Sequence, residues 1–131
     1  NRPWQHVLEP LYGYLLLGYK LYKNKKTYSG AWNFGTNKNT VTNVEEVVKK
    51  IINYWGSGKY QIKSKNTHYE QANLQLNINK AKKILKWTPT LSIDDSIKFT
   101  VEWYKSVLVD QDQYEKITEK QIKDFLKIKT L

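Results

Sequence analysis

Four stretches of this 131-residue chain carry apolar residues at the three- and four-residue spacing of a helix with one buried face. The clearest follows a capping box of Thr42 and Glu45 and ends at Gly56, since glycine readily takes the left-handed conformation that stops a helix. Its apolar positions are Val44, Val47, Val48, Ile51, Ile52 and Trp55. We therefore predict a helix over residues 44–55. The spacing limits the chain to a fold that packs several amphipathic helices.

The first of the four helices is predicted to start at Pro10, because the first helical turn tolerates a residue without an N–H group. The polar residues 23–26 are expected to end it. Its predicted buried face consists of Leu8, Leu11, Tyr12, Leu15, Leu16, Tyr19 and Tyr22. A short strand over Trp4–Val7 is expected to lead into this helix.

Two further helices are predicted near the C-terminus, each with its own capping box. Ser92 and Asp95 cap the first of them, and Thr118 and Gln121 cap the second. Their apolar positions are Ile93, Ile97, Val101, Tyr104 and Leu108 in the first, and Ile122, Phe125 and Leu126 in the second. Residues 110–131 are therefore expected to form a helical extension.

Short apolar or aromatic runs between polar loops predict strands in addition to the one at residues 4–7. These runs cover residues 27–35, 60–63 and 74–77. Asn79 is expected to cap a short helix over residues 80–85. Together the elements predict an α/β fold with short strands and several helices, forming a single domain over residues 1–131.

The net charge of +10 first suggests a partner with negative charge, such as a nucleic acid. However, Arg2 is the only arginine among the 22 basic residues, and the lysines are spread along the whole chain. Arginine dominates base and phosphate recognition, so we interpret the excess as compositional and expect no nucleic-acid partner. A non-catalytic lysine-rich binding module stays open as an alternative.

Several classes of chemistry have no motif in this chain. It contains no cysteine, and its two histidines, His6 and His68, are too far apart in sequence for a local metal-binding pair. The six glycines stand at positions 13, 18, 30, 35, 56 and 58, which gives no Gly-x-Gly-x-x-Gly loop for a dinucleotide. We therefore expect no metal site, catalytic residue or cofactor site within the chain, and we interpret His6 as a hydrogen-bonded structural histidine.

The pattern Tyr-x-x-x-Lys occurs at Tyr19 with Lys23 and at Tyr22 with Lys26. With ten tyrosines and abundant lysine, chance accounts for both matches. There is neither an apolar run of membrane-spanning length nor a signal-peptide pattern, so we expect a cytoplasmic protein without a membrane partner.

Four motifs, in the same order, resemble the C-terminal part of the extended short-chain dehydrogenase/reductases that act on nucleotide sugars. They are Arg2-Pro3-Trp4-Gln5-His6-Val7-Leu8-Glu9-Pro10, Ala31-Trp32-Asn33-Phe34-Gly35, Asn79-Lys80-Ala81-Lys82-Lys83-Ile84-Leu85-Lys86-Trp87-Thr88-Pro89, and Thr100-Val101-Glu102-Trp103-Tyr104. The first motif is similar to the CDP-glucose 4,6-dehydratase branch of this NAD-dependent epimerase/dehydratase family, and the segment Thr118–Ile122 resembles the ending of that branch.

The resemblance implies that the chain is the nucleotide-sugar-binding portion of such an enzyme, with the Rossmann core missing. The family converts CDP-glucose to CDP-4-keto-6-deoxyglucose with bound NAD, and its NAD site and catalytic residues would lie outside this chain. The chain alone is therefore expected to be inactive. A C-terminal part of another nucleotide-sugar dehydratase or epimerase stays open as an alternative. A domain surface left uncovered would favour self-association.

The same resemblance implies four substrate-binding residues. Arg2 matches the phosphate-binding arginine of the family, a role that suits a guanidinium fork. Asn33 matches an asparagine at a strand end near the phosphates. Glu70 and Asn73 match a stretch that lines the nucleotide site, although Asn73 stands where the family usually has tyrosine.

Overall fold

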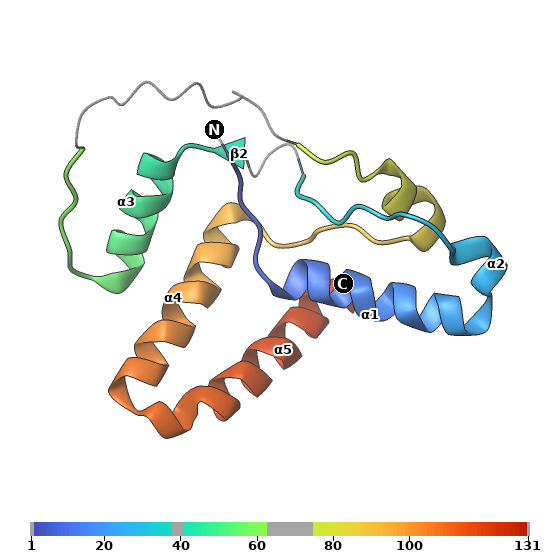
Figure 1. The fold of residues 1–131 in the computed structure, drawn as a ribbon. Helices are drawn as coiled ribbons and strands as arrows, with labels where there is room; N and C mark the ends of the chain where they lie inside the picture. Colours follow the sequence, from blue (N-terminus) through green and yellow to red (C-terminus); the bar gives the residue numbers. More distant parts are fainter. Residues whose placement is uncertain (1, 38–40, 63–74, 131) are drawn as a thin grey trace.

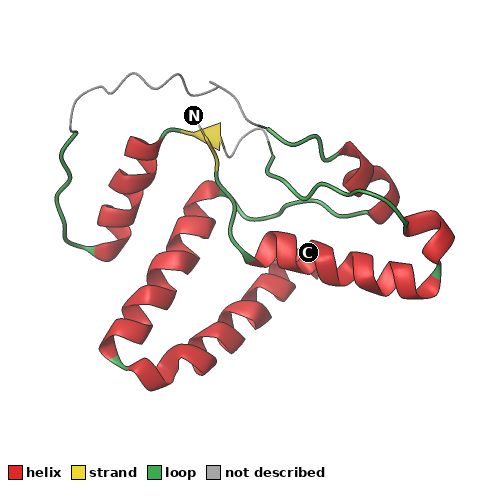
Figure 2. Ribbon diagram, viewed as in Figure 1, coloured by secondary structure: helices red, strands yellow, loops and turns green. Residues whose placement is uncertain are grey.

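The computed structural model describes residues 2–37, 41–62 and 75–130, and in these the chain is mostly helical (Figures 1 and 2). Its elements in chain order are β1 (Arg2–Pro3), α1 (Leu8–Lys23), α2 (Lys25–Tyr28), β2 (Val41–Thr42), α3 (Val44–Trp55), the single π-helical turn η2 (Ala81–Leu85), α4 (Ile93–Val109), the short 3-10 turn η3 (Gln111–Gln113) and α5 (Tyr114–Thr130).

Helices α4 and α5 form a V whose apex is η3, and α3 packs beside α4 (Figure 1). Helix α1 begins beside the C-terminal end of α5 and extends away from the V toward α2 (Figure 1). Contacts of Tyr12 with Phe125 and of Glu9 with Lys129 join α1 to α5. The last helix therefore packs against the first.

Two apolar clusters form the core of the described residues. One surrounds Trp87 and gathers residues from three segments that are far apart in the sequence: Phe34, Ile78, Ala81, Leu85 and Trp87, flanked by Tyr12, Leu16, Leu17, Tyr28 and Trp32. The other lies between α3 and α4 and consists of Val47, Ile97 and Val101, with Trp4, Tyr54, Trp55 and Ile93 against it.

The capping box of Ser92 and Asp95 is confirmed, and it begins α4. The box predicted for Thr42 and Glu45 is wrong by one residue, because Asn43 caps α3 and accepts a hydrogen bond from the backbone N–H of Glu46 at 2.8 Å. Thr42 instead pairs with Arg2 in the antiparallel ladder of β1 and β2. A residue held in that ladder is not placed to cap the helix that follows.

The box predicted for Thr118 and Gln121 is also wrong, because α5 begins earlier, at Tyr114. Thr118 lies within the helix and donates its hydroxyl to the carbonyl of Tyr114 at 2.6 Å. Gln121 donates its side-chain amide to the carbonyl of Phe99 at 2.6 Å, which ties α5 to α4. Both side chains have the polar groups of a cap but use them inside the fold.

The helix predicted after Pro10 is confirmed as α1, but part of its predicted buried face is wrong. Four of the apolar side chains expected in the core are exposed: Leu11, Leu15, Tyr19 and Tyr22. The buried residues of α1 are Glu9 and Gly13. The helix turns this side inward because the carboxylate of Glu9 has buried hydrogen-bond donors and Gly13 lets the ring of Phe34 approach closely.

None of the predicted strands forms a strand in the described residues. In the described residues the only ladder pairs Arg2–Pro3 with Val41–Thr42, so the α/β class has loose support. Residues 4–7 lie outside it, 25–28 are helical, and 30–37, 60–62 and 75–77 form no strand. Near Trp32 and Phe34 the aromatic pattern reflects packing around Trp87, since no neighbouring backbone completes a ladder there.

Candidate functional site

A polar pocket of about 330 Å³ opens where the segment after Phe34 meets the segment that leads into η2. The pocket is lined by Thr36, Asn37, Gln75, Leu76, Asn77, Ile78, Asn79 and Lys82. The two segments pack closely at Gly35, where a Cβ would lie 3.0 Å from the Cβ of Leu76. The pocket thus depends on two chain segments that pack tightly together.

Two groups give the pocket its chemistry. Thr36 is only 5% exposed, and among the described residues its hydroxyl has no hydrogen-bond partner. Lys82 donates its ammonium to Asn37 Oδ1 at 3.2 Å, and Asn37 Nδ2 donates to the carbonyl of Pro89 at 3.2 Å. A buried hydroxyl without a partner is costly. Because the hydroxyl oxygen of Thr36 is closed off from the pocket, Lys82 is the one of the two groups that can meet a ligand.

The π-helical turn η2 fixes the position of Lys82. Asn77 Oδ1 accepts from the backbone N–H of Asn79 at 2.9 Å and starts the turn. The turn ends at Lys86, whose φ of 59° is in the left-handed region. Turns of this wide type often occur at functional sites, because they rotate a side chain away from the regular helical position.

The structure connects one of the four predicted site residues, Asn33, to this pocket. Asn33 donates its side-chain amide to the carbonyl of Asn77, a lining residue, at 3.3 Å. Arg2 lies half-buried in β1, and Gln5, three residues further on, donates to the carbonyl of Gly35 at 3.2 Å. Predicted residues Glu70 and Asn73 lie outside the described residues.

A second lysine lies close to Asn33. Lys80 donates its ammonium to the carbonyl of Ala31 at 2.8 Å, and this ammonium is 4.2 Å from the centre of the Trp32 ring. Lys80 and Lys82 therefore bring two positive charges to the segments that form the pocket. The residues that line it include no acid, histidine or tyrosine, so the arrangement suits binding of an anion rather than proton transfer.

Sequence reasoning missed Thr36, Asn37 and Lys82. Lys82 belongs to a motif that the sequence does reveal, but nothing in the motif marks this lysine apart from its neighbours Lys80 and Lys83. Thr36 and Asn37 fall in a polar segment without a recognisable pattern. Their proximity to Lys82, 45 residues away from Asn37, is visible only in three dimensions.

Tyr19, Tyr22 and Lys23 of the two Tyr-x-x-x-Lys matches lie in α1, whereas Lys26 lies in α2. The ammonium of Lys23 is 5.7 Å from the ring centre of Tyr19 and 5.8 Å from that of Tyr22. Both rings are exposed, which differs from the packing role expected for them. An exposed lysine above a phenol ring is a cation–π contact, and it lacks the enclosure of a catalytic site.

His6 is buried, as expected for a structural histidine, and its Nδ1 accepts from the backbone N–H of Leu8 at 3.3 Å. Burial lowers the pKa of the imidazole, while the nearby charge of Glu9 raises it by a smaller amount.

Among the described residues, no group of three or more potential metal ligands is present. None of the described helices combines the length and the apolar character needed to cross a membrane.

No family model matches the sequence. A CDP-glucose 4,6-dehydratase of Salmonella typhimurium is 32% identical to the chain over 130 residues, which is 98% of the chain and 36% of the relative. The chain therefore spans about a third of the length of this relative. The similarity confirms the predicted resemblance, and the share that it covers is consistent with a match to the C-terminal part.

Proposed function

We propose, from the relationship of this chain to the CDP-glucose 4,6-dehydratases, that it forms the nucleotide-sugar-binding part of a 4,6-dehydratase, with CDP-glucose as the preferred ligand. The observation that carries the proposal is the polar pocket of about 330 Å³, whose lining includes Lys82, a residue that donates its ammonium to Asn37. A diphosphate supplies charged acceptor oxygens for this ammonium.

The position of Asn33 supports the same proposal, and we propose that Arg2 also contacts the diphosphate. Asn33 donates a hydrogen bond to the carbonyl of Asn77, which lines the pocket. Gln5, three residues after Arg2, donates to the carbonyl of Gly35, two residues after Asn33. In the proposed complex, Lys82 and Arg2 would balance the two negative charges of the diphosphate. Glu70 and Asn73 are proposed to contact the nucleotide.

The residues that the structure describes do not fit NAD. The glycines with positive φ are Gly30, Gly56 and Gly58, and none of them lies between a strand and the start of a helix, where a dinucleotide-binding loop places its glycines. We therefore propose that the dehydratase reaction uses NAD held by residues outside this chain. The chain alone would bind substrate without converting it.

Titration of the 131-residue chain with nucleotide sugars tests the proposal by calorimetry. CDP-glucose is expected to bind more tightly than dTDP-glucose or UDP-glucose. A tighter complex with dTDP-glucose or UDP-glucose would favour the alternative, a part of another nucleotide-sugar dehydratase or epimerase. No binding of any of the three would contradict the proposed function.

Lys82 and Lys83 form a matched pair for this experiment, because each substitution to methionine removes one positive charge from neighbouring positions. Lys82→Met is expected to weaken CDP-glucose binding about tenfold or more, since a charged hydrogen bond contributes roughly 1.5–3 kcal/mol. Lys83 is exposed and does not line the pocket, so Lys83→Met is expected to leave the affinity unchanged. Equal losses in both variants would indicate a general charge effect.

We also propose that the exposed apolar residues of α1 cause the chain to self-associate, as an uncovered domain surface would.

The alternative function, a non-catalytic lysine-rich binding module, has less support than nucleotide-sugar binding. Lysines in ion pairs are distributed over α3, α4 and α5 rather than gathered on one face: Lys49, Lys50, Lys98, Lys120, Lys123, Lys127 and Lys129. The cytoplasmic location expected from the sequence is part of the same proposal.

A further inference from the structure

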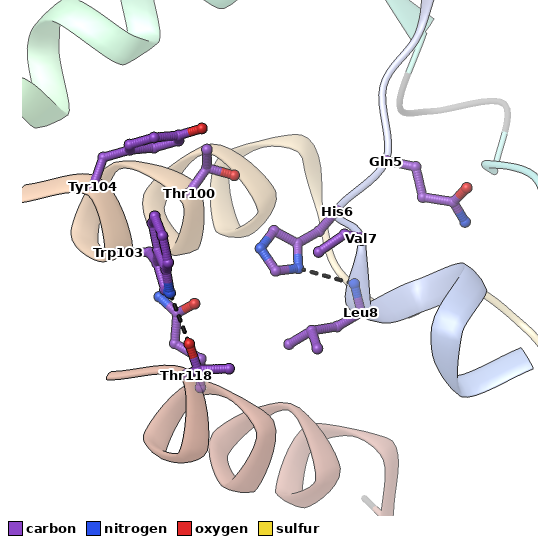
Figure 3. Close-up of a pocket in the computed structure, with 9 residues that line it drawn as sticks. Gln5, His6, Val7, Leu8, Thr100, Trp103, Tyr104 and Thr118 are labelled. Atoms are coloured by element: carbon purple, nitrogen blue, oxygen red, sulfur yellow. Dashed lines mark hydrogen bonds between the residues drawn. The ribbon is translucent and has the colours of Figure 1, made fainter. Parts of the chain in front are cut away.

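A second cavity, of about 400 Å³, lies between α4, α5 and the segment that enters α1 (Figure 3). Val7 and Leu8 form one side, and the aromatic rings of Trp103 and Tyr104 stand on the other. Thr118 contributes from α5. This cavity shares no lining residue with the polar pocket, so a ligand for it is independent of the proposed function.

Most polar groups around the second cavity already have partners inside the protein. The indole N–H of Trp103 donates to the Thr118 hydroxyl at 2.8 Å, and this hydroxyl donates to the carbonyl of Tyr114 at 2.6 Å. The hydroxyl of Thr100 donates to the carbonyl of Ser96 at 2.8 Å. These bonds hold the wall in place and leave it a largely apolar and aromatic surface.

His6 is the exception. The residue is only 8% exposed, its ring packs edge-on against Phe99 with 5.6 Å between ring centres, and its Nδ1 accepts from the N–H of Leu8. Because Nδ1 is an acceptor, the proton of the neutral ring is on Nε2. In Figure 3 this second nitrogen faces α4 across the cavity, and within the described part of the chain no hydrogen bond engages it.

The charge of the cavity limits its ligand. None of the residues that line it is a lysine, an arginine or an acid. Glu9 acts on His6 by its charge, but its carboxylate is bonded to the backbone of Thr90 and Leu91 and to Lys129 instead. A charged ligand would therefore lose its hydration here without gaining an ionic partner.

We propose that this cavity binds a small, uncharged, planar aromatic molecule that carries one hydrogen-bond acceptor. The ring lies between Leu8 and Trp103, and the acceptor takes the Nε2–H of His6. The volume suits a molecule of two fused rings, and an apolar cavity with one directed polar group is typical of small-molecule sites.

Quinoline and naphthalene are matched probes, because they have the same shape and only quinoline has an acceptor nitrogen. We would titrate each into the 131-residue chain and follow the imidazole nitrogens by ¹⁵N NMR. The chain has two histidines, so His68→Asn assigns the signals of His6. Quinoline is expected to shift the His6 Nε2 signal and to bind about fivefold more tightly than naphthalene, since a neutral hydrogen bond contributes roughly 0.5–1.5 kcal/mol.

Two variants separate the hydrogen bond from the cavity. His6→Phe keeps a ring against Phe99 but removes the donor, so quinoline and naphthalene are expected to bind it equally. Val7→Trp keeps the histidine and fills the cavity, so both probes are expected to lose at least about tenfold in affinity. Circular dichroism checks that each variant is folded, and Val7→Trp carries the test if His6→Phe is not.

Three results would overturn the proposal. One is equal binding of the two probes to the unmodified chain, which would remove the role of His6. Another is unchanged binding by Val7→Trp, or signal changes confined to the exposed tyrosines of α1, since either would place the probes elsewhere. The third is no binding of quinoline up to its solubility limit.

Discussion

The carboxylate of Glu9 and the ammonium of Lys129 lie 3.0 Å apart, with side-chain exposures of 1% and 8%, and they join the first helix to the last. The other carboxylate oxygen of Glu9 accepts from the backbone N–H groups of Thr90 and Leu91 at 2.6 and 2.7 Å. Lys129 also donates to the carbonyl of Thr88. One buried ion pair thus connects three parts of the chain: α1, the segment before α4, and α5.

Removing one partner of this pair is expected to be costly. Lys129→Met leaves the charge of Glu9 buried without its ammonium, and we expect the free energy of unfolding to fall by about 3–5 kcal/mol in urea titrations. The double variant Glu9→Gln/Lys129→Met is expected to recover part of this loss. Lys127→Met is the control, because Lys127 is exposed on the same helix and its loss is expected to change little. Equal effects of the two lysines would contradict a special role for Lys129.

Lys86 adopts a conformation that favours glycine, with φ of 59° at the end of η2. The left-handed conformation costs a non-glycine residue roughly 1–2 kcal/mol, part of which glycine loses again through its greater freedom in the unfolded chain. Lys86→Gly is therefore expected to raise the free energy of unfolding by about 0.5–1 kcal/mol. Lys83→Gly, within the same turn, is expected to lower it by about 1 kcal/mol. A loss of stability in Lys86→Gly would contradict this account.

Sequence reasoning located the helices well, because their apolar spacing and the Ser92–Asp95 cap are local features. It failed for the strands, because a strand needs a partner that local sequence does not specify. It also chose the wrong face of α1. Glu9 can be buried only because Lys129, at the far end of the chain, supplies a charge, and no local pattern announces such a pair.

The residues of the candidate site were also predicted only in part. Arg2 and Asn33 were predicted because they belong to recognisable motifs, and the structure links Asn33 to the pocket through Asn77. Thr36 and Lys82 were missed because their role follows from two segments that meet in space. Contacts of this kind depend on the packing around Gly35 rather than on spacing along the chain.

Gly13 and Gly18 lie in the same helix and predict opposite effects of the same substitution. A Cβ at Gly13 would lie 2.4 and 2.6 Å from two ring atoms of Phe34, whereas a Cβ at Gly18 would meet nothing within 4 Å. Gly13→Ala is expected to cost about 1–3 kcal/mol through overpacking. Gly18→Ala is expected to gain up to about 1 kcal/mol, because alanine favours the helix. Thermal unfolding of both variants checks the pair, and a gain at both positions would contradict the contact with Phe34.

The stability of the chain is expected to depend on pH through His6. Burial lowers the pKa of His6 below 6.5 in the folded state, so the unfolded chain binds more protons as the pH falls below 6.5. The contribution of His6 to stability is therefore complete above this value and is lost as the pH falls toward the folded pKa. His6→Phe lacks this loss. Urea titrations of both proteins at several values between about pH 5 and pH 8 test the prediction, and parallel curves would contradict it.

Self-association is expected to depend on four exposed residues along one side of α1: Leu11, Leu15, Tyr19 and Tyr22. Leu15 is 76% exposed, and Leu15→Glu places a charge in the middle of this apolar surface. In sedimentation experiments the unmodified chain is expected to exceed its monomer mass of 15.6 kDa as concentration rises, whereas Leu15→Glu stays at that mass. Val109→Glu is the matched control, because Val109 is 88% exposed at the end of α4. If Val109→Glu dissociates the oligomer and Leu15→Glu does not, the contact between copies lies on α4. If the unmodified chain is a monomer at every concentration, the apolar surface of α1 is not covered by a second copy.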